Sequence, residues 1–288
     1  MITPAIRLGT APDPAAELGE SPAVDHDAGE VWWVDITGRG LHRSGLESGV
    51  TASWGLPEEP GFVVQAASGQ PIVGMETGLF AFDPHSGSLK KLLDQTRFGH
   101  RFNDATVDST GVLWVSTMAR DAARGAGAIW CVSDDLTLLP VAAGLTIPNG
   151  MAVDRIRRRL YYSDSHPDVQ TIWTASLVGH GEIGKSAVFA DMKPMSGRPD
   201  GAALDADGRY WIAAVDGAAL KVFSPDGEPL SEVALPVTFP TKLAFYGEHC
   251  ENLVVTSKRD GEHGGGLTFL SCAKENVRGT RQTRWSRQ

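Results

Sequence analysis

The 288-residue chain has few cysteines, almost no helical periodicity and no long apolar run. Its three cysteines, Cys131, Cys250 and Cys272, form no Cys-x-x-Cys pair, which argues against a disulfide framework and favours a reducing, cytoplasmic compartment. No segment approaches the roughly 20 apolar residues of a membrane helix, and the N-terminus lacks a signal-peptide pattern. A Gly-x-Ser-x-Gly motif is also missing, so a serine nucleophile of that type has no support.

Positive charge is scarce as well. The formal net charge is −9, and the one basic cluster, Arg155–Arg159, precedes an expected strand and is interpreted as a solvated edge. A strongly acidic chain is a poor partner for nucleic acid or for an anionic membrane. We therefore expect neither partner.

A short apolar or aromatic run returns six times. With Trp33, Val73, Trp114, Tyr161, Trp211 and Val254 as markers, the steps between runs are 40, 41, 47, 50 and 43 residues. A period of roughly 40–50 residues built from strands is typical of propeller blades. Six repeats in 288 residues leave 48 residues each, and the 33 Gly and 17 Pro provide many tight turns. The sequence predicts an all-β, six-bladed propeller with four-stranded antiparallel blades, as a single domain over residues 1–288.

Closing a ring of blades requires pairing between the two ends of the chain. We expect a first strand near Ile2–Leu8 to pair with a strand near Gly266–Leu270. The basic, polar tail after Cys272 is expected to be poorly ordered.

Four polar residues precede their markers at nearly the same distance. Asn103 lies 11 residues before Trp114, Asn149 lies 12 before Tyr161, Asp200 lies 11 before Trp211, and Glu20 lies 13 before Trp33. Any one of them alone could belong to a turn or to the surface. Equal phase in a repeat instead predicts that all four project from the same end of the ring.

Glu, Asn and Asp side chains offer only oxygen ligands. That set suits a hard divalent cation such as Ca²⁺, Mg²⁺ or Mn²⁺, and Zn²⁺ is also possible. No histidine lies in phase with these positions, which disfavours a histidine-rich zinc site.

At this point the motifs resemble the SMP-30/gluconolactonase/luciferin-regenerating-enzyme-like family over nearly the whole chain. The resemblance rests on the order and spacing of short motifs: Leu18–Pro22, Trp33–Ile36, Arg101–Asp104, Thr117-Met118, Pro148–Gly150, Tyr161–Ser165, Pro199–Gly201 and Pro240-Thr241. It implies a six-bladed propeller that hydrolyses sugar lactones with a divalent metal ion in its central channel.

The resemblance also implies roles for individual residues. It places Glu20, Asn149 and Asp200 on the metal, and Arg101 and Asn103 on the substrate. Asp121 stands where family members often carry a Glu, as a further substrate contact at the start of the segment 120–127, which is either a loop over the channel mouth or a plain surface loop.

Several roles have alternatives. Asp200 is the candidate general base, or a pure metal ligand. Arg101 contacts substrate, or forms a structural ion pair with Asp104, which is interpreted as fixing its own turn. Asp164 is expected to brace the segment around Asn149 rather than to act in catalysis.

The leading hypothesis is metal-dependent hydrolysis of a small-molecule sugar lactone to the aldonic acid. One alternative is a propeller that binds a divalent ion without turnover, and another is an esterase or lactonase for non-sugar esters. The identity of the sugar, its ring size, the native metal and the oligomeric state do not follow from the sequence.

Overall fold

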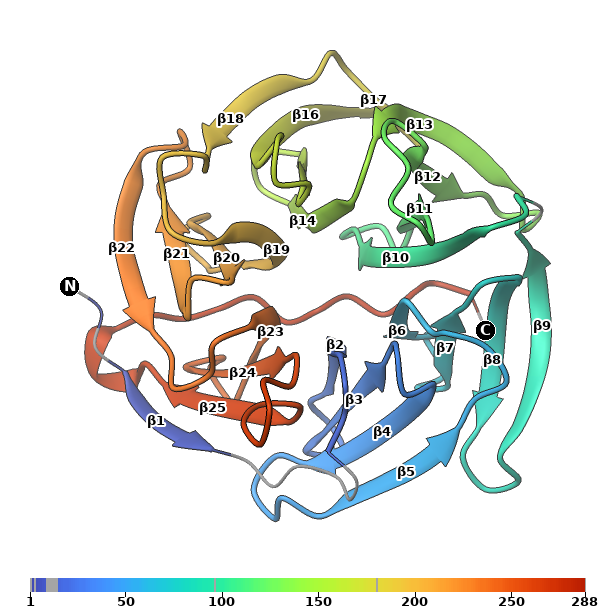
Figure 1. Cartoon of the computed structure of the whole chain (residues 1–288), viewed down its shortest axis with the longest axis horizontal. Coiled ribbons are helices and arrows are strands. Elements are labelled where there is room, and N and C mark those ends of the chain that lie inside the picture. The colour runs from blue at the N-terminus through green and yellow to red at the C-terminus, as the bar shows by residue number, and fades with distance from the viewer. Residues whose placement is uncertain (1, 3, 9–14, 96, 180, 288) are drawn as a thin grey trace.

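The structure is a computed structural model that describes residues 2, 4–8, 15–95, 97–179 and 181–287. Six antiparallel sheets are arranged as the blades of a ring (Figure 1), which confirms the predicted six-bladed propeller. Apart from the single 3-10 turn Ala273–Glu275, the described elements are all strands. None of the described residues forms a helix long and apolar enough to cross a membrane.

Each blade is named by its order along the chain, and its strands are given from the centre of the ring outward. Blade 1 is β2 (Gly19–Asp25), β3 (Glu30–Asp35), β4 (Gly40–Gly45) and β5 (Thr51–Gly55). Blade 2 is β6 (Phe62–Gln65), β7 (Pro71–Gly74), β8 (Gly78–Asp83) and β9 (Ser88–Asp94). Blade 3 is β10 (His100–Val107), β11 (Leu113–Ala119), β12 (Gly127–Val132) and β13 (Leu138–Leu145).

The remaining blades follow the same plan with one variation. In blade 4, β14 (Pro148–Asp154), β15 (Arg159–Asp164) and β16 (Thr171–Gly179) are followed by two outer strands that both pair with β16, namely β17 (Glu182–Ile183) and β18 (Ala187–Asp191). Blade 5 is β19 (Arg198–Leu204), β20 (Tyr210–Val215), β21 (Ala219–Phe223) and β22 (Pro229–Ala234). Blade 6 is β23 (Pro240–Tyr246), β24 (Asn252–Ser257), β25 (Leu267–Ser271) and β1 (Ala5–Leu8).

The six repeated runs form the second strand of each blade, not the innermost one. These strands are apolar on both faces because each blade is covered by its neighbours; every residue of β7, β11 and β20 is buried. The sequence pattern also predicts that the four in-phase polar residues come just before the innermost strands, but they lie within β2, β10, β14 and β19, which are themselves innermost (Figure 1). That part of the prediction was wrong because Asn-Gly and Asp-Gly pairs are typical of turns.

The ring closes as predicted. β1 pairs antiparallel with β25, with Ala5 opposite Ser271 and Ile6 opposite Leu270. The first and last strands of the chain therefore share blade 6, and the outer edge of that blade is provided by the N-terminal strand.

The C-terminal tail contradicts the expectation of poor order, because it crosses the ring (Figure 1) and its backbone forms hydrogen bonds with several blades. The Thr280 side chain donates to Leu204 in blade 5, and Gln282 accepts from the Val24 amide in blade 1 at 2.8 Å. The Trp285 amide donates to Gln65 in blade 2 at 2.8 Å, and the Trp285 side chain is buried. These partners, near the ends of the inner strands, place the tail at the end of the channel opposite the four polar residues.

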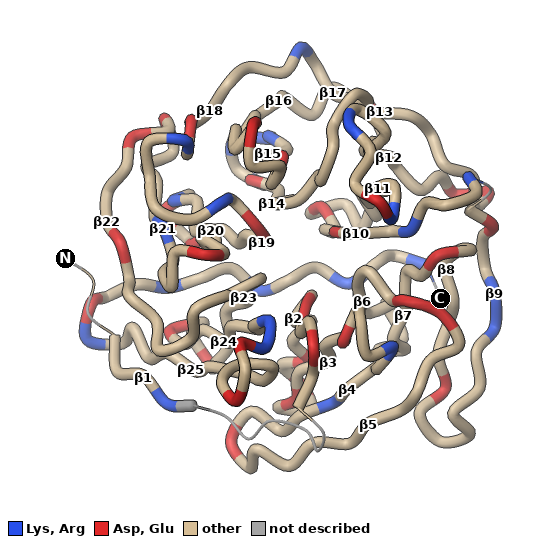
Figure 2. Tube along the Cα trace, in the orientation of Figure 1, with Lys and Arg blue, Asp and Glu red and all other residues tan. Residues whose placement is uncertain are grey.

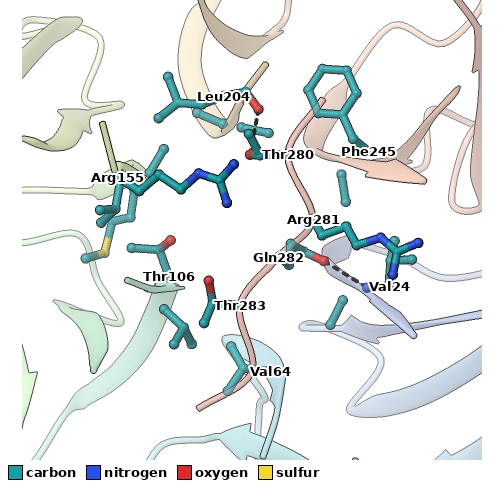
Figure 3. Close-up of a pocket in the computed structure, with 18 of the residues that line it drawn as sticks. Val24, Val64, Thr106, Arg155, Leu204, Phe245, Thr280, Arg281, Gln282 and Thr283 are labelled. Carbon is teal, nitrogen blue, oxygen red and sulfur yellow. Dashed lines mark hydrogen bonds between the residues drawn. The ribbon is translucent and has the colours of Figure 1, made fainter. Parts of the chain in front are cut away.

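Between the tail and the inner strands lies a cavity of about 220 Å³ (Figure 3). Thr106, Leu204 and Phe245 line it from three blades, and Thr280 and Thr283 line it from the tail. The tail thus crosses one end of the central channel (Figure 1).

Candidate functional site

The site is built on a backbone irregularity shared by five of the six inner strands. The register of pairing with the second strand shifts between Glu20 and Ala23 in β2, and between Asn149 and Ala152 in β14. Equivalent shifts interrupt β10, β19 and β23. A bulge re-aims side chains and is common beside functional sites. It lets the residue at the start of each inner strand face the channel axis.

Positive φ angles accompany two of these bulges. Ser21, directly after Glu20, has a φ of 55°, and Gly150, directly after Asn149, has a φ of 63°. A Cβ at Gly150 would lie 2.6 Å from the Tyr210 hydroxyl oxygen, so this position needs glycine for space as well as for conformation. The Asn149-Gly150 pair therefore belongs to a strand bulge, although its sequence resembles that of a turn.

Glu20 and Asp200 come together as a buried carboxylate pair. Their residues are 8% and 9% exposed, and Figure 2 shows acidic positions on β2 and β19 near the centre of the ring. Burial raises the pKa of Glu20 to about 7. Burial and the charge of Glu20 together raise the pKa of Asp200 well above its usual range. Two carboxylates whose charges repel in a low-dielectric site are stabilised by taking up a proton or by binding a cation.

The hydrogen bonds leave most of these oxygens free. Glu20 Oε2 accepts the Ser21 amide at 2.7 Å, whereas the Asp200 carboxylate accepts no hydrogen bond from the part of the chain that the structure describes. Buried polar groups are normally satisfied. The Asp200 oxygens are not among the described side-chain atoms that are both fully enclosed and unpaired, so the carboxylate opens to the channel, where a further ligand can reach it.

Asn103 and Asn149 join the pair through a direct contact between blades 3 and 4. Asn103 Nδ2 donates to Asn149 Oδ1 and to the Pro148 carbonyl, each at 3.0 Å. Arg101 donates to Asn103 Oδ1 at 2.6 Å and lowers the pKa of Glu20 through its positive charge. Hydrogen bonds thus link Arg101, Asn103 and Asn149, and charge interactions link Glu20 to Arg101 and to Asp200.

Glu59, from the loop between β5 and β6, is a site residue that sequence reasoning missed. Its carboxylate lies 3.8 Å from Arg101 Nε and 2.9 Å from Arg120 Nη2. Arg120 also pairs with Glu76 at 3.2 Å. These ion pairs fix the guanidinium of Arg101 beside Asn103. The pair Glu58-Glu59 gives no periodic signal, since it lies in a loop.

Asp121 lies at the rim rather than among the buried residues. It is exposed, and its carboxylate accepts the Ala123 amide at 3.1 Å within the turn after β11. The segment 120–127 contacts both neighbouring blades, through Arg120 to Glu59 and through an ion pair between Arg124 and Asp168. It is therefore attached at the channel rim on both sides.

Asp104 pairs with Lys242 and not with Arg101, so that alternative for Arg101 was wrong. The carboxylate of Asp104 contacts Lys242 Nζ and accepts the amides of Ala105 and Met151, each at 2.8 Å. It thus links blades 3, 4 and 6 and does more than fix its own turn. Lys242 was missed, although Pro240-Thr241-Lys242 stands in phase with Pro199-Asp200-Gly201.

Asp164 braces the segment before Asn149, as expected. Its two carboxylate oxygens accept the amides of Thr146 at 2.7 Å and Ile147 at 3.0 Å. Asp35 does the same in blade 1 for the amides of Glu17 and Leu18, which precede Glu20. Two equivalent aspartates therefore fix the entry to two of the candidate ligand positions.

The donor set fits a divalent cation. Two buried carboxylates and an amide oxygen are hard ligands, and among the described residues only the Ser21 amide donates a hydrogen bond to the carboxylates. Within the described residues no group of three or more His, Cys, Asp or Glu side chains is arranged for a metal. A cation here would therefore rely on the Asn149 amide in addition to Glu20 and Asp200.

Comparison with known proteins provides independent evidence on the family of this chain. The chain is 33% identical over 247 residues to a 6-deoxy-6-sulfogluconolactonase of Pseudomonas putida, with 84% of each protein covered. It is 29% identical to an L-arabinolactonase of Azospirillum brasilense, covering 92% of each. The solved structure of regucalcin, a calcium-binding protein of Agrobacterium tumefaciens, superposes with a TM-score of 0.88 at 28% identity, covering 99% of this chain and 98% of that one.

The family assignment follows from the extent of the match. The SMP-30/gluconolactonase/LRE-like region profile matches residues 18–259, which include every inner strand and all the residues of the candidate site. The chain belongs to the SMP-30/gluconolactonase/LRE-like family.

Proposed function

We propose that this protein hydrolyses small sugar lactones to aldonic acids with one divalent cation held by Glu20, Asn149 and Asp200. The observation that carries the proposal is the buried Glu20–Asp200 pair, whose pKa values are raised and which, among the described residues, accepts only the Ser21 amide. The lactonase names of the relatives support the substrate class. The regucalcin name supports a cation such as Ca²⁺, while the oxygen ligands also suit Mg²⁺, Mn²⁺ or Zn²⁺.

A bound cation of this kind polarises a carbonyl and lowers the pKa of water. The chain supplies the rest of the chemistry. Asp200 accepts a proton from the attacking water. The water oxygen bonds to the lactone carbonyl carbon, the bond from that carbon to the ring oxygen breaks, and the ring oxygen takes the proton from Asp200 and leaves as a hydroxyl group.

Arg101 and Asn103 bind the substrate in this proposal. Arg101 has planar donors suited to sugar hydroxyls or to the carboxylate that forms, and its side chain is 11% exposed. Asn103 lies between Arg101 and Asn149, so it links the substrate side of the site to the cation side. Asp121, on the exposed rim, is proposed to contact parts of the substrate that extend from the channel.

The test is turnover of glucono-, xylono-, arabinono- and galactonolactone, followed with a pH indicator, with EDTA and after return of each metal. We expect hydrolysis above spontaneous ring opening that EDTA removes and a divalent metal restores. No metal-dependent rate on any lactone would favour a cation-binding protein without turnover. Faster hydrolysis of aryl esters than of sugar lactones would favour a non-sugar esterase.

The Asp200→Asn variant tests the assignment of the base. Loss of the proton acceptor should lower kcat by about 10²–10⁴-fold, with an unchanged circular dichroism spectrum because the side chain faces the channel. Asp207→Asn, at an exposed turn of the same blade, serves as the matched control. Near wild-type kcat in Asp200→Asn would remove Asp200 from the mechanism.

A further inference from the structure

Lys242 spans the central channel. It lies on β23 in blade 6, and its ammonium reaches β10 in blade 3, on the opposite side of the six-bladed ring. There it contacts the Asp104 carboxylate and donates to the Ala105 carbonyl at 3.0 Å. The side chains of Lys242 and Asp104 are only 5% and 3% exposed. A buried lysine is rarely retained without a specific partner or task.

The stem of Lys242 packs against the backbone that carries Asp200. A Cβ on Gly201 would lie 2.3 Å from Lys242 Cγ and 2.4 Å from Lys242 Cβ. Residue 201 therefore has no side chain because Lys242 occupies that space. Lys242 also lines the cavity closed by the tail. It thus lies between the carboxylate pair and that cavity, whose lining includes Lys242 but neither Glu20 nor Asp200.

The position of the ammonium is fixed. Asp104 is held by the amides of Ala105 and Met151, so its carboxylate has little freedom to move with Lys242. The charge of Lys242 lowers the pKa of both Glu20 and Asp200, and the charge of Asp104 raises them. Both candidate ligands therefore experience the Lys242–Asp104 pair directly.

We propose that Lys242 is a positioning residue of the cation site: a fixed internal ammonium that partly neutralises Glu20 and Asp200, keeps them assembled without the cation, and limits how tightly the cation binds. The inference rests on the proposed cation site. Its distinctive consequence is that neutralising Lys242 and neutralising Asp104 should change the cation affinity in opposite directions. Removing the ammonium should tighten cation binding, and removing the Asp104 charge should weaken it.

The experiment is calorimetric titration of Ca²⁺ and of Mn²⁺ into metal-free protein at pH 8. Lys242→Met should bind about tenfold more tightly than wild type, and Asp104→Asn about tenfold more weakly, for one unit charge acting through a partly screened interior. Lys242→Gln, which keeps a hydrogen-bond donor, provides a second neutral variant if Lys242→Met folds poorly. A merely structural role would weaken binding in every variant, because damage does not raise affinity.

Lys221→Met is the matched control. Lys221 is also a buried lysine in an ion pair, with Nζ 2.5 Å from Glu232 Oε2, but it lies on β21, away from the channel. Its loss should leave cation affinity unchanged. Equal or weaker binding by both neutral Lys242 variants, with normal binding by wild type, would overturn this inference alone. Absence of cation binding by wild type would overturn the proposed cation site and this inference with it.

Discussion

At the level of single residues, the central fact is that two acids are buried where their charges repel. Glu20 and Asp200 come from blades 1 and 5, and burial raises the pKa of each. Isolated carboxylates are costly to bury unless a partner compensates them. Arg101 and Lys242 compensate partly, since both lower the pKa of Glu20 without returning it to its ordinary value.

The pH dependence of metal-free stability follows from this cost. A carboxyl whose pKa is raised on folding, here from 4.5 to about 7 for Glu20, stabilises the folded state below pH 4.5 and loses that contribution as the pH rises through about 7. In EDTA, the free energy of unfolding should therefore fall between pH 5 and pH 8 by about 3 kcal/mol more for the wild type than for Glu20→Gln. Urea unfolding at the two pH values measures the difference.

Glu228→Gln is the control for that measurement, because Glu228 is exposed on a turn of blade 5 and its loss should leave the pH slope as in wild type. Glu20→Gln should also weaken cation binding, since a full ligand charge is removed. Parallel pH slopes for wild type and Glu20→Gln would show that Glu20 carries no raised pKa.

Glu59 should act on substrate binding through Arg101. In Glu59→Gln the ion pairs to Arg101 and Arg120 are lost, so the Arg101 guanidinium is free to leave Asn103. We expect KM for the preferred lactone to rise about tenfold, the equivalent of 1.4 kcal/mol, with a smaller change in kcat. Steady-state kinetics on the purified variant provide the measurement.

Its neighbour provides the control. Glu58 is bonded to the Thr77 amide and hydroxyl at 2.8 and 2.7 Å and has no contact with Arg101 among the interactions of the described residues. Glu58→Gln should keep the wild-type KM. An unchanged KM in Glu59→Gln would mean that Arg101 is held without Glu59 or does not contact substrate.

At the level of elements, the second strand of each blade is predictable from sequence and the innermost strand is not. The second strands are buried on both faces, so their apolar runs are unbroken and their spacing reveals the repeat. The inner strands begin at bulges with polar residues and, in two cases, positive φ angles. A bulge of this kind uses the same residues as a turn.

The candidate site divides in the same way. Glu20, Asn103, Asn149 and Asp200 are predictable because they repeat in phase with the blades. Lys242 carries a signal in its phase, yet its partner Asp104 is 138 residues away and on the opposite blade. Glu59 carries none, because the path of a loop between blades is decided by packing across the ring.

At the level of the whole molecule, the two ends of the chain complete the ring in different ways. The N-terminal strand β1 pairs within blade 6, whereas the C-terminal tail crosses from blade 5 to blades 1, 2 and 3. Because a ring of blades is held by contacts between neighbours, a segment that bonds to several blades resists opening at any one junction. The tail also crosses the channel at the end away from the candidate site (Figure 1).

Trp285 is the residue through which this connection is best tested. The residue is 4% exposed and belongs to one hydrophobic cluster with Phe62, Ile72 and Leu113 from blades 2 and 3. Trp285→Ala should lower the free energy of unfolding by about 3–5 kcal/mol, as expected for loss of a large buried aromatic ring. Urea denaturation measures this loss, with Ser286→Ala, at an exposed neighbouring position, as the control.

Because the tail lies at the far end of the channel, lactone turnover below the unfolding transition should stay close to wild type. A loss below about 1 kcal/mol, smaller than even modest core truncations, would show that the tail does not hold the ring together.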